Sequence, residues 1–578
     1  MNRQTPTPIS STLSTAVLTI ALASGAAYAQ PPGNTSNNGG PHTTDEPEQM
    51  AGLGSWQTQA LVTVGDEGSQ TDPNGPAGAD VNLNKFDYRF PGIPDGMGAF
   101  QLDSKTVRVL INHEFSSSRG YAYPLESGAM LTGARVSYID INVNNRKVVG
   151  MGPAYHTIYN RAGLEVDEAS DLAFNGLNRL CSANLFDAGD FGLEDTVFLT
   201  GEETGGGSEW ALDVARGDLW AAPMMGLAAW ESATMLDDKE SGKVVVLIGD
   251  DRGLAPLLLY VGQKGAEPAT GPYDPSDFLV RNGLGLGNLY VWVADNGDET
   301  TSEFNGTGNS RSGKFVKITH FDPGQAGAPG FDALGFVTQA AQDALADAED
   351  HFEFSRPEDV ATDPNDPTRA VLASTGRSSQ APDDKWGTTY LIDVDLENAD
   401  LSVALDNPAL ETISADVHIV YDGDDCGSGN GSSGGVGDCA GGQFADPDDG
   451  LRSPDNLDWA DDGMIYLQED RSYSQFGLTS GEEASIWQLD PTTGLLTRIG
   501  QMDRSAVATG QTDTDPNDLG DWESSGILDV TQFFGNKGDE IVLIGNTQAH
   551  SLRGGLIAGE STDDDNLVQG GQIFLMTQ

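Results

Sequence analysis

The chain of 578 residues carries 88 acidic residues against 30 basic ones, so its formal net charge is -58 at pH 7. This charge argues against binding to nucleic acids or anionic membranes, because both would repel it, and it favours cations as partners. An acidic surface suited to salty surroundings is the alternative explanation. All-β propellers and barrels of this length often form one domain, so length alone does not divide the chain.

The N-terminus has the pattern of a signal peptide. Arg3 precedes the apolar stretch 16–27, and residues 27–29 fit a signal-peptidase site. We therefore expect residues 1–29 to be removed on export by the general secretory route, to the periplasm or the exterior, since no twin-arginine pair occurs. Residues 30–55, rich in Pro, Gly, Asn and Thr, are expected to form a flexible linker. No later segment has the ~20 apolar residues that span a bilayer, so we expect no membrane insertion. We also expect the protein to be a monomer.

From residue 56 to residue 578, short β-branched and aromatic runs alternate with Gly, Asp, Asn and Pro turns, a pattern typical of strands. Residues 336–349 have alanines and leucine at helical spacing and predict the main helix. A loose repeat of an acidic turn followed by two apolar segments has four copies, at 177–203, 230–251, 356–376 and 453–470. The sequence therefore predicts an all-β fold, a six-bladed β-propeller over residues 56–578 with long insertions and a few short helices.

Acidic residues directly follow several of the predicted buried strands. The apolar runs that end in this way lie at 197–203, 244–251, 289–299 and 464–470. If these strands point the same way, as the blades of a propeller do, their ends gather carboxylates around one mouth. Carboxylates that close cannot all ionise unless positive charge lies among them. Ca²⁺ favours such oxygen ligands, so the pattern predicts bound cations.

Turn residues at one equivalent place of the repeat would surround the same pore. They are Glu231, Arg356, Glu358, Asp455 and Asn456. A single turn acid often only caps its own backbone, but recurrence at one position favours a shared site. Arg356 is expected either to pair with these carboxylates or to clamp an anion in a bidentate manner.

The adjacent Glu202 and Glu203 raise a geometric question. Neighbouring residues of an extended strand point to opposite faces, so the two can share an ion only if the backbone turns, as the following glycines permit. A solvated strand end is the alternative, and it applies equally to Asp470. We expect Asp250-Asp251, Asp295-Asn296 and the acids of 422–449 to lie on the solvated surface.

Three cysteines occur in the chain. Cys426 and Cys439 bracket a Gly- and Ser-rich loop that a disulfide could close. Cys181 is then either a small core residue, which general statistics favour, or a metal ligand. The sequence contains no G-x-S-x-G elbow, Walker A loop, H-E-x-x-H helix or C-x-x-C pair, and His113 is expected to be structural.

Several segments match a known family in their order along the chain. They are VLINHEF (109–115), LCSANL with FLTGEE (180–203), GLAAWESATMLDD (226–238), RPED (356–359), SPDNLDWADDGMIYLQED (453–470), DPTTGLLTRI (490–499), DWESSGI (521–527) and IGNTQAH (544–550). Over most of residues 85–555 the chain thus resembles the PhoX-type alkaline phosphatases. These are exported bacterial six-bladed propellers that use calcium and iron and were formerly known as a domain of unknown function.

The resemblance implies a role for each matching residue. Cys181 is similar to the iron-ligating thiolate of the family, and Arg356 to an arginine that grips the substrate phosphate. The metal-binding carboxylates and amide of the family match Glu202, Glu203, Glu231, Glu358, Asp455 and Asn456, with Asp470 beside them. The implied cofactors are Ca²⁺ and Fe³⁺.

Three segments depart from the family pattern. Residues 180–199 replace a Gly-rich segment and a W-G-T-W run between the cysteine and the acidic pair, Trp230 stands where a histidine is usual, and IGNTQAH replaces a Q-H-P ending. The first departure bears most directly on whether Cys181 ligates iron, because it could change the backbone that presents the thiolate.

Pattern and resemblance together predict an exported, metal-dependent phosphatase. It would hydrolyse small phosphomonoesters without a protein nucleophile, in agreement with the missing serine motifs. Two alternatives remain open. One is a non-catalytic calcium-binding propeller at the cell surface, and the other is a calcium-dependent hydrolase of another ester, such as a phosphodiester, phytate or a lactone.

Overall fold

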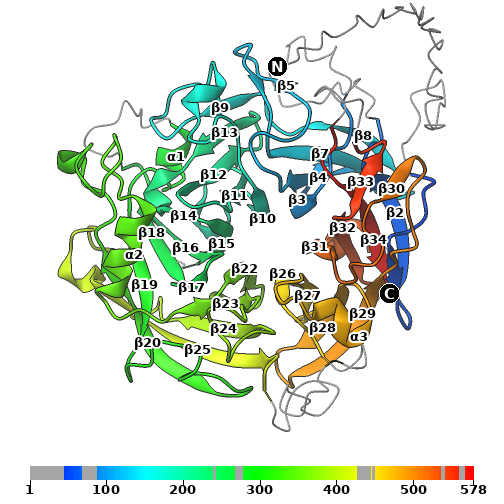
Figure 1. Cartoon of the computed structure of the whole chain (residues 1–578). Coiled ribbons are helices and arrows are strands. Elements are labelled where there is room, and N and C mark those ends of the chain that lie inside the picture. Colours follow the sequence, from blue (N-terminus) through cyan, green and yellow to red (C-terminus); the bar gives the residue numbers. More distant parts are fainter. Residues whose placement is uncertain are drawn as a thin grey trace, which may run out of the picture.

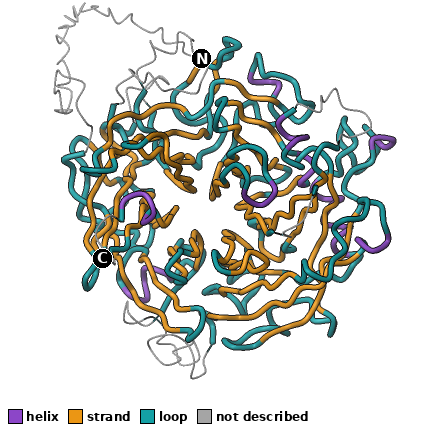
Figure 2. The backbone as a smooth tube through the Cα atoms, turned by 180° about the vertical axis from the view of Figure 1, so that it is seen from behind, coloured by secondary structure: helices purple, strands orange, loops and turns teal. Residues whose placement is uncertain are grey.

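The computed structural model describes residues 44–67, 88–237, 242–266, 277–425, 444, 450–535, 540–558 and 566–578. Within these ranges, the larger sheets supply six blades that radiate from one axis, with their innermost strands around the centre (Figures 1 and 2). The predicted all-β, six-bladed propeller is confirmed. The predicted signal peptide and both Cys426 and Cys439 lie outside the described residues.

Each blade is a mostly antiparallel sheet that begins with its innermost strand. Blade 1 comprises β3 (Pro94–Asp103), β4 (Thr106–His113), β7 (Arg135–Asn142) and β8 (Val148–Pro153). Blade 2 comprises β10 (Leu180–Phe186), β11 (Val197–Glu202), β12 (Gly207–Asp213), β13 (Asp218–Ala221) and β9 (Thr157–Tyr159), with β14 (Leu227–Ala228) beside β12. Blade 3 comprises β15 (Trp230–Leu236), β16 (Lys243–Asp250), β18 (Leu258–Gln263), β19 (Gly287–Ala294) and β20 (Ser310–Ile318).

The remaining blades follow the same plan. Blade 4 comprises β22 (Pro357–Asp363), β23 (Asp366–Ser374), β24 (Thr388–Val394) and β25 (Thr412–Asp422). Blade 5 comprises β26 (Pro454–Trp459), β27 (Ile465–Glu469), β28 (Ser485–Asp490), β29 (Leu495–Met502) and β1 (Met50–Gly52). Blade 6 comprises β31 (Trp522–Asp529), β32 (Val542–Ala549), β34 (Gly570–Thr577) and β2 (Gln57–Thr63). The four repeat copies of the sequence correspond to the first two strands of blades 2 to 5.

Blades 3 and 4 are joined at their outer edges. Their outermost strands β20 and β25 pair antiparallel from Ser310↔His418 to Val316↔Thr412, which merges the two blades into one nine-stranded sheet. The shorter pairs of strands lie outside the blades: β5 (Tyr123–Pro124) with β6 (Met130–Leu131), β17 (Gly253–Ala255) with β21 (Phe354–Ser355), and β30 (Gln511–Asp513) with β33 (Leu552–Gly555).

The N-terminal segment closes the ring twice. β1 is the outermost strand of blade 5, where Met50 pairs with Met502, and β2 is the outermost strand of blade 6, where Gln57 pairs with Thr577. Residues 44–55 of the expected linker therefore belong to the propeller. The composition of this segment concealed its strand, because β1 is only three residues long.

Apolar side chains fill the space between neighbouring blades. Each of the six interfaces contains one buried cluster. Strands such as β16 read KVVVLIGD and are buried along their whole length, because both faces of a blade contact a neighbour. This explains why the second strands of the blades are continuous apolar runs rather than alternating ones.

Helices are few and short, as predicted. The expected helix 336–349 is observed as α2 (Gln339–Asp347), which begins after Thr338. Four of the nine residues of α2 are alanine, which favours a helix. The other helices are α1 (Phe278–Arg281), α3 (Phe476–Ser480) and α4 (Thr531–Phe534). Among the described residues, none of the helices has the length and apolar character needed to cross a membrane.

Closure by β2 should be needed for stability. Leu61 is fully buried between blades 6 and 1. We expect Leu61→Ala to lower the free energy of unfolding by about 2–5 kcal/mol, through lost burial and the cavity left behind. Urea unfolding followed by tryptophan fluorescence measures the change. The matched control is Gln57→Ala on the exposed start of the same strand, for which a shift of more than about 0.5 kcal/mol would be unexpected.

Candidate metal centre

The innermost strand of each blade places its second residue at the axis of the propeller. These six residues, here called the inner ring, are Asp95, Cys181, Glu231, Glu358, Asp455 and Glu523. None is more than 8 % exposed. Five carboxylates and one thiol are therefore withdrawn from bulk water at equivalent positions of the fold.

One backbone irregularity aims these side chains. In all six blades the first residue of the innermost strand pairs with the last residue of the second strand. In blades 1 to 5 the register then shifts between the first and fourth residues of the innermost strand, and in blade 6 it shifts further along, between Ser525 and Ile527. Such a β-bulge breaks the in-and-out alternation of a strand and redirects a side chain.

The residue before the innermost strand has a left-handed backbone in four blades. The φ angles are +49° at Ile93, +52° at Arg179, +65° at Arg356 and +48° at Ser453. For residues other than glycine this conformation costs of order 1–3 kcal/mol and persists only where surrounding contacts compensate. The compensating contacts here are hydrogen bonds from backbone N–H groups to the carbonyls of these same residues.

The residue that directly follows the second strand of each blade forms a second ring. Its members are Glu114, Glu203, Asp251, Thr375, Asp470 and His550. In five blades their backbone N–H donates to the carbonyl of the residue before the innermost strand: Glu114 to Ile93 (2.9 Å), Glu203 to Arg179 (2.8 Å), Asp251 to Ala229 (2.8 Å), Thr375 to Arg356 (3.0 Å) and Asp470 to Ser453 (3.1 Å). The repeated bond fixes the second ring beside the inner ring.

The two rings combine into four triads of metal-ligating side chains. They are Asp95–Glu114–Cys181, Cys181–Glu203–Glu231, Glu231–Asp251–Glu358 and Asp455–Asp470–Glu523, and in each the ligand atoms lie within 4.8 Å of one another. Every triad has the same construction: an inner-ring residue, the second-ring residue of the same blade and the inner-ring residue of the next blade. Oxygens at this spacing suit a cation with ligand distances of about 2.3–2.6 Å.

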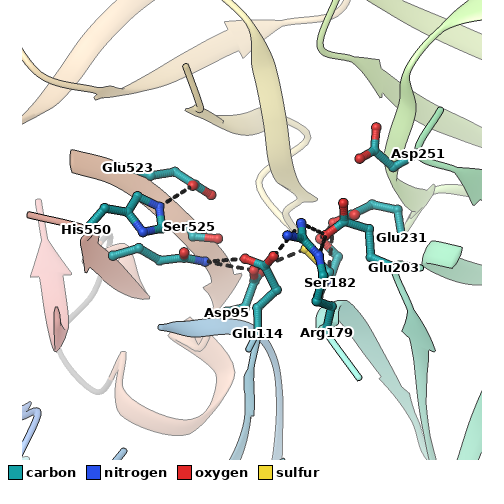
Figure 3. A network of polar contacts seen from close by, with 12 residues as sticks. Asp95, Glu114, Arg179, Ser182, Glu203, Glu231, Asp251, Glu523, Ser525 and His550 are labelled. Carbon is teal, nitrogen blue, oxygen red and sulfur yellow. Dashed lines mark hydrogen bonds and ion pairs between the residues drawn. The ribbon is translucent and has the colours of Figure 1, made fainter. Parts of the chain in front are cut away.

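Two gaps interrupt the series of triads. Between blades 4 and 5 the second-ring residue is Thr375, whose hydroxyl donates to the carbonyl of Pro454 at 3.0 Å. Between blades 6 and 1 it is His550, whose Nε2 lies 3.0 Å from Glu523 Oε2 (Figure 3). Three adjacent triads and one separate triad result.

Two arginines contact the rings. Arg356 binds Asp251 through Nε (2.6 Å) and Nη2 (3.0 Å), and Nη2 lies 2.8 Å from Glu358 Oε1. Arg179 donates through Nε to Glu203 Oε2 at 3.0 Å, and its Nη2 lies 2.6 Å from Glu114 Oε1 (Figure 3). Nine carboxylates and one thiol of the triads thus face two guanidinium groups.

Burial and the neighbouring charges shift the pKa values of the ring residues. Burial, followed by the neighbouring carboxylates, raises the pKa of Glu231 and of Asp455 well above its ordinary value. Burial also raises the pKa of Glu358, although Arg356 opposes the shift, and that of Asp95 to about 7. The pKa of Asp251 is lowered, since its bonds with Arg356 outweigh the opposing effect of burial.

The thiol of Cys181 lies in the same buried, negatively charged environment. Burial, then Asp95 and Glu231, raises its pKa well above the ordinary value. Its Sγ donates to Asp95 Oδ2 at 3.2 Å. A thiol in this environment loses its proton only if a cation replaces it.

Unpartnered buried oxygens show that the rings fit cations. Glu231 Oε2 and Asp455 Oδ1 are buried and accept no hydrogen bond within the described residues. An unsatisfied buried acceptor costs about 1–3 kcal/mol, more when charged, which coordination to a cation would recover. All-oxygen triads suit Ca²⁺, and the two triads that share Cys181 suit a softer metal such as iron.

The structure brings together most of the site residues predicted from the sequence. Cys181, Glu203, Glu231, Glu358, Asp455 and Asp470 belong to triads, and Arg356 contacts Glu358 and Asp251 of one triad. Asn456 lies beside the rings, where its Nδ2 donates to Asp95 Oδ1 at 3.0 Å and its Oδ1 accepts from Ser525. Cys181 is presented by the bulge common to the blades, while the altered segment after it turns at the outer end of β10, near Asp190–Gly192.

Glu202 is not part of the triads. Its side chain accepts hydrogen bonds from the backbone N–H groups of Asn178 (3.1 Å) and Ser208 (3.1 Å). Only its neighbour Glu203, one residue beyond the end of β11, reaches the second ring. Glu202 was expected to bind metal together with Glu203, but the structure points its side chain to these backbone N–H groups instead, because neighbouring residues of the strand end face opposite sides.

The prediction that Asp250 and Asp251 lie on the solvated surface is wrong. Asp250 is fully buried and Asp251 is 9 % exposed, because β16 ends at the axis like the other second strands. Asp295, at the end of β19, is exposed as predicted. Asp422 is 3 % exposed and accepts from the backbone of Gly306, so the first acid of 422–449 is also not solvated.

Besides Asp251, five ring residues and Arg179 were not predicted from the sequence. The five are Asp95, Glu114, Thr375, Glu523 and His550. A usable signal existed for two of them: Ile-Pro-Asp at 93–95 parallels Arg-Pro-Glu at 356–358, and Trp-Glu at 522–523 parallels 230–231. His113 is structural as expected, fully buried with its ring nitrogens against Gly92 O and Ser137 Oγ.

Comparison with solved structures supports the fold. PhoX of Pseudomonas fluorescens, solved with vanadate as a transition-state analogue, superposes with a TM-score of 0.55 over 93 % of this chain and 97 % of that chain, at 17 % identity. An α-L-arabinofuranosidase of Fusarium graminearum covers 84 % and 92 % at 10 % identity, with a TM-score of 0.32 that is too low to support an argument. No family model matches the chain, and no curated protein matches it in sequence.

Charge repulsion in the rings predicts an unusual mutational effect. In chelator-treated protein at pH 8, we expect Glu231→Gln to raise the melting temperature, because the variant removes an ionised carboxylate while keeping the oxygen that accepts from Ser182 N–H (3.3 Å) and Oγ (2.9 Å). The raised pKa means that the folded state loses stability as pH rises through it, so the gain should be smaller at pH 5 than at pH 8, because a larger share of Glu231 is protonated at the lower pH.

Differential scanning calorimetry at both pH values measures this effect. The control is Glu194→Gln, at a side chain that is 56 % exposed, for which we expect almost no change at either pH. A destabilising effect of Glu231→Gln at pH 8 in the absence of metal would show that the ring is not under charge repulsion.

Proposed function

We propose that this protein is a metal-dependent hydrolase of phosphomonoesters. The observation that carries the proposal is the set of triads, with their unpartnered buried oxygens, around Arg356. The shared fold with PhoX and the motif order quoted above support it. Export, small phosphorylated substrates and a monomeric state belong to the same proposal.

The triads would hold two kinds of cation. Glu231–Asp251–Glu358 and Asp455–Asp470–Glu523 offer only oxygen and would hold Ca²⁺, whereas the two triads that share Cys181 offer a thiolate and would hold iron. Bound there, the cations supply Lewis-acid activation and neutralise charge on phosphate. The reaction consumes water and breaks the ester P–O bond to release phosphate and an alcohol.

The residues of the chain bind and orient the phosphate. Asp251 and Glu358 hold the guanidinium of Arg356 through Nε and Nη2, so Nη1 remains to donate to a phosphate oxygen. A guanidinium fixed in this way before substrate arrives acts as preorganised electrostatic stabilisation. Its burial among the blades keeps bulk water away and so strengthens each of these interactions.

Hydrolysis of p-nitrophenyl phosphate tests the proposal directly. Purified residues 30–578 loaded with Ca²⁺ and Fe³⁺ should turn over this substrate, and a chelator should abolish turnover. We expect Glu358→Gln to lower kcat/KM at least about 100-fold, because it loosens Arg356 and removes a ligand. Glu411→Gln, an exposed partner of Lys317 outside the rings, is the control and should retain activity.

The outcomes separate the alternatives. Chelator-sensitive hydrolysis of a phosphodiester or a lactone, with none of phosphomonoesters, would favour a different esterase. Calcium-dependent melting without hydrolysis of any ester would favour a non-catalytic calcium-binding propeller. Turnover that persists fully in Glu358→Gln would contradict the proposed site.

The thiol predicts a selective loss of metal. We expect Cys181→Ser to reduce bound iron at least about tenfold while calcium is retained, since a serine hydroxyl is a far poorer ligand for iron than a thiolate and two triads lack Cys181 altogether. Elemental analysis by mass spectrometry after dialysis measures both metals on one sample. Unchanged iron, or an equal loss of both metals, would contradict the assignment.

A further inference from the structure

Arg179 and Arg356 occupy the same position in two blades. Each directly precedes the innermost strand of its blade, and each has a left-handed backbone, with φ of +52° and +65°. The carbonyl of each accepts the backbone N–H of the second-ring residue, at 2.8 Å from Glu203 and 3.0 Å from Thr375. Blade 3, which begins with Trp230 and Glu231, lies between them.

The two arginines also use their donors in the same way. Each directs Nε and Nη2 to a second-ring carboxylate, Glu203 for Arg179 and Asp251 for Arg356. The Nη2 of each also reaches a second carboxylate, Glu114 and Glu358 respectively. Within the described residues Nη1 of both makes no hydrogen bond, so each guanidinium keeps one edge for a ligand.

Exposure distinguishes the two residues. The side chain of Arg356 is 15 % exposed and that of Arg179 is 44 % exposed. Glu203, bound by Arg179, interacts with Asp251, bound by Arg356, so two carboxylates separate the guanidinium groups. A phosphate at the buried Arg356 would therefore leave the more exposed Arg179 accessible to another group of the same substrate.

We propose that Arg179 recognises a second phosphate group on the substrate, carried by the leaving group of the phosphomonoester held at Arg356. This inference rests on the proposed function and names its substrate class: esters of phosphate with an alcohol that bears another phosphate. A guanidinium with two N–H donors engaged and one edge open suits a phosphate better than an uncharged group does. Arg179 is thereby a specificity-determining residue rather than a counter-ion of Glu114 and Glu203 alone.

A matched pair of substrates tests the inference. Fructose 6-phosphate and fructose 1,6-bisphosphate differ by one phosphate, and we expect the metal-loaded protein to favour the bisphosphate in kcat/KM. Arg179→Gln should lower that preference about tenfold or more, the range of a charge-assisted contact. Arg356→Gln should depress both substrates together. The control is Arg369→Gln on β23, a side chain that is 37 % exposed and paired with Asp393 of β24, which should change neither value.

Binding provides a readout that does not depend on turnover. Isothermal titration calorimetry of the metal-loaded protein should show that methylenediphosphonate binds more tightly than methylphosphonate. This difference in affinity should be reduced in Arg179→Gln, and reduced to a smaller extent in Arg179→Lys. The lysine variant keeps the charge and guards against a folding defect in the glutamine variant.

The outcomes separate this inference from the proposed function. Hydrolysis of both sugars with a preference that Arg179→Gln leaves intact would overturn the role of Arg179 while the phosphatase stands. Absence of hydrolysis would overturn the phosphatase. In that case tighter binding of the diphosphonate that depends on Arg179 would support the second phosphate site, and equal binding of the two phosphonates would overturn it.

Discussion

Repulsion between like charges at the axis is the constraint on which the rest of the structure depends. Nine carboxylates and a thiol meet where six blades converge, and burial removes most of the water that would screen them. Neutral donors relieve part of the strain. Asp95, for example, accepts from the amide groups of Asn456 (3.0 Å) and Gln548 (2.8 Å). Arg179 and Arg356 relieve another part, and protonation or bound cations must supply what remains.

The backbone of each blade sets positions and leaves the chemistry to single residues. The pairing of the first residue of the innermost strand recurs in all six blades, and the hydrogen bond from the second ring recurs in five. One substitution at such a position therefore changes which ligands are present between two neighbouring blades, while the backbone contacts of the fold stay the same. Thr375 and His550 stand where other blades carry an acid, and they leave an asymmetric centre in a ring of nearly equivalent blades.

A site residue could be predicted from the sequence where a clear apolar run marked the strand that carries it. Glu203, Asp251 and Asp470 end long apolar runs, so their place at a strand end was visible, although that pattern alone did not keep Asp251 among the site residues. The innermost strands of blades 1 and 6 read PDGMGAFQLD and WESSGILD, where Gly and Ser interrupt the apolar pattern, and this hid Asp95 and Glu523. Glu202 could not be separated from Glu203, because that depends on the residue at which β11 stops.

The double closure by the N-terminal segment has a consequence for how the centre is assembled. Gln49 donates to Gln572, 523 residues away, so contacts that complete blades 5 and 6 join the first and last parts of the chain to be synthesised. Closing a loop of that length is entropically costly, and folds dominated by such distant pairings form slowly. Blade 6 carries Glu523 and borders Asp95, so the distant contacts that close the ring also complete the binding site. The assembly of the centre is thus coupled to a closure between the two ends of the chain that has a high entropic cost.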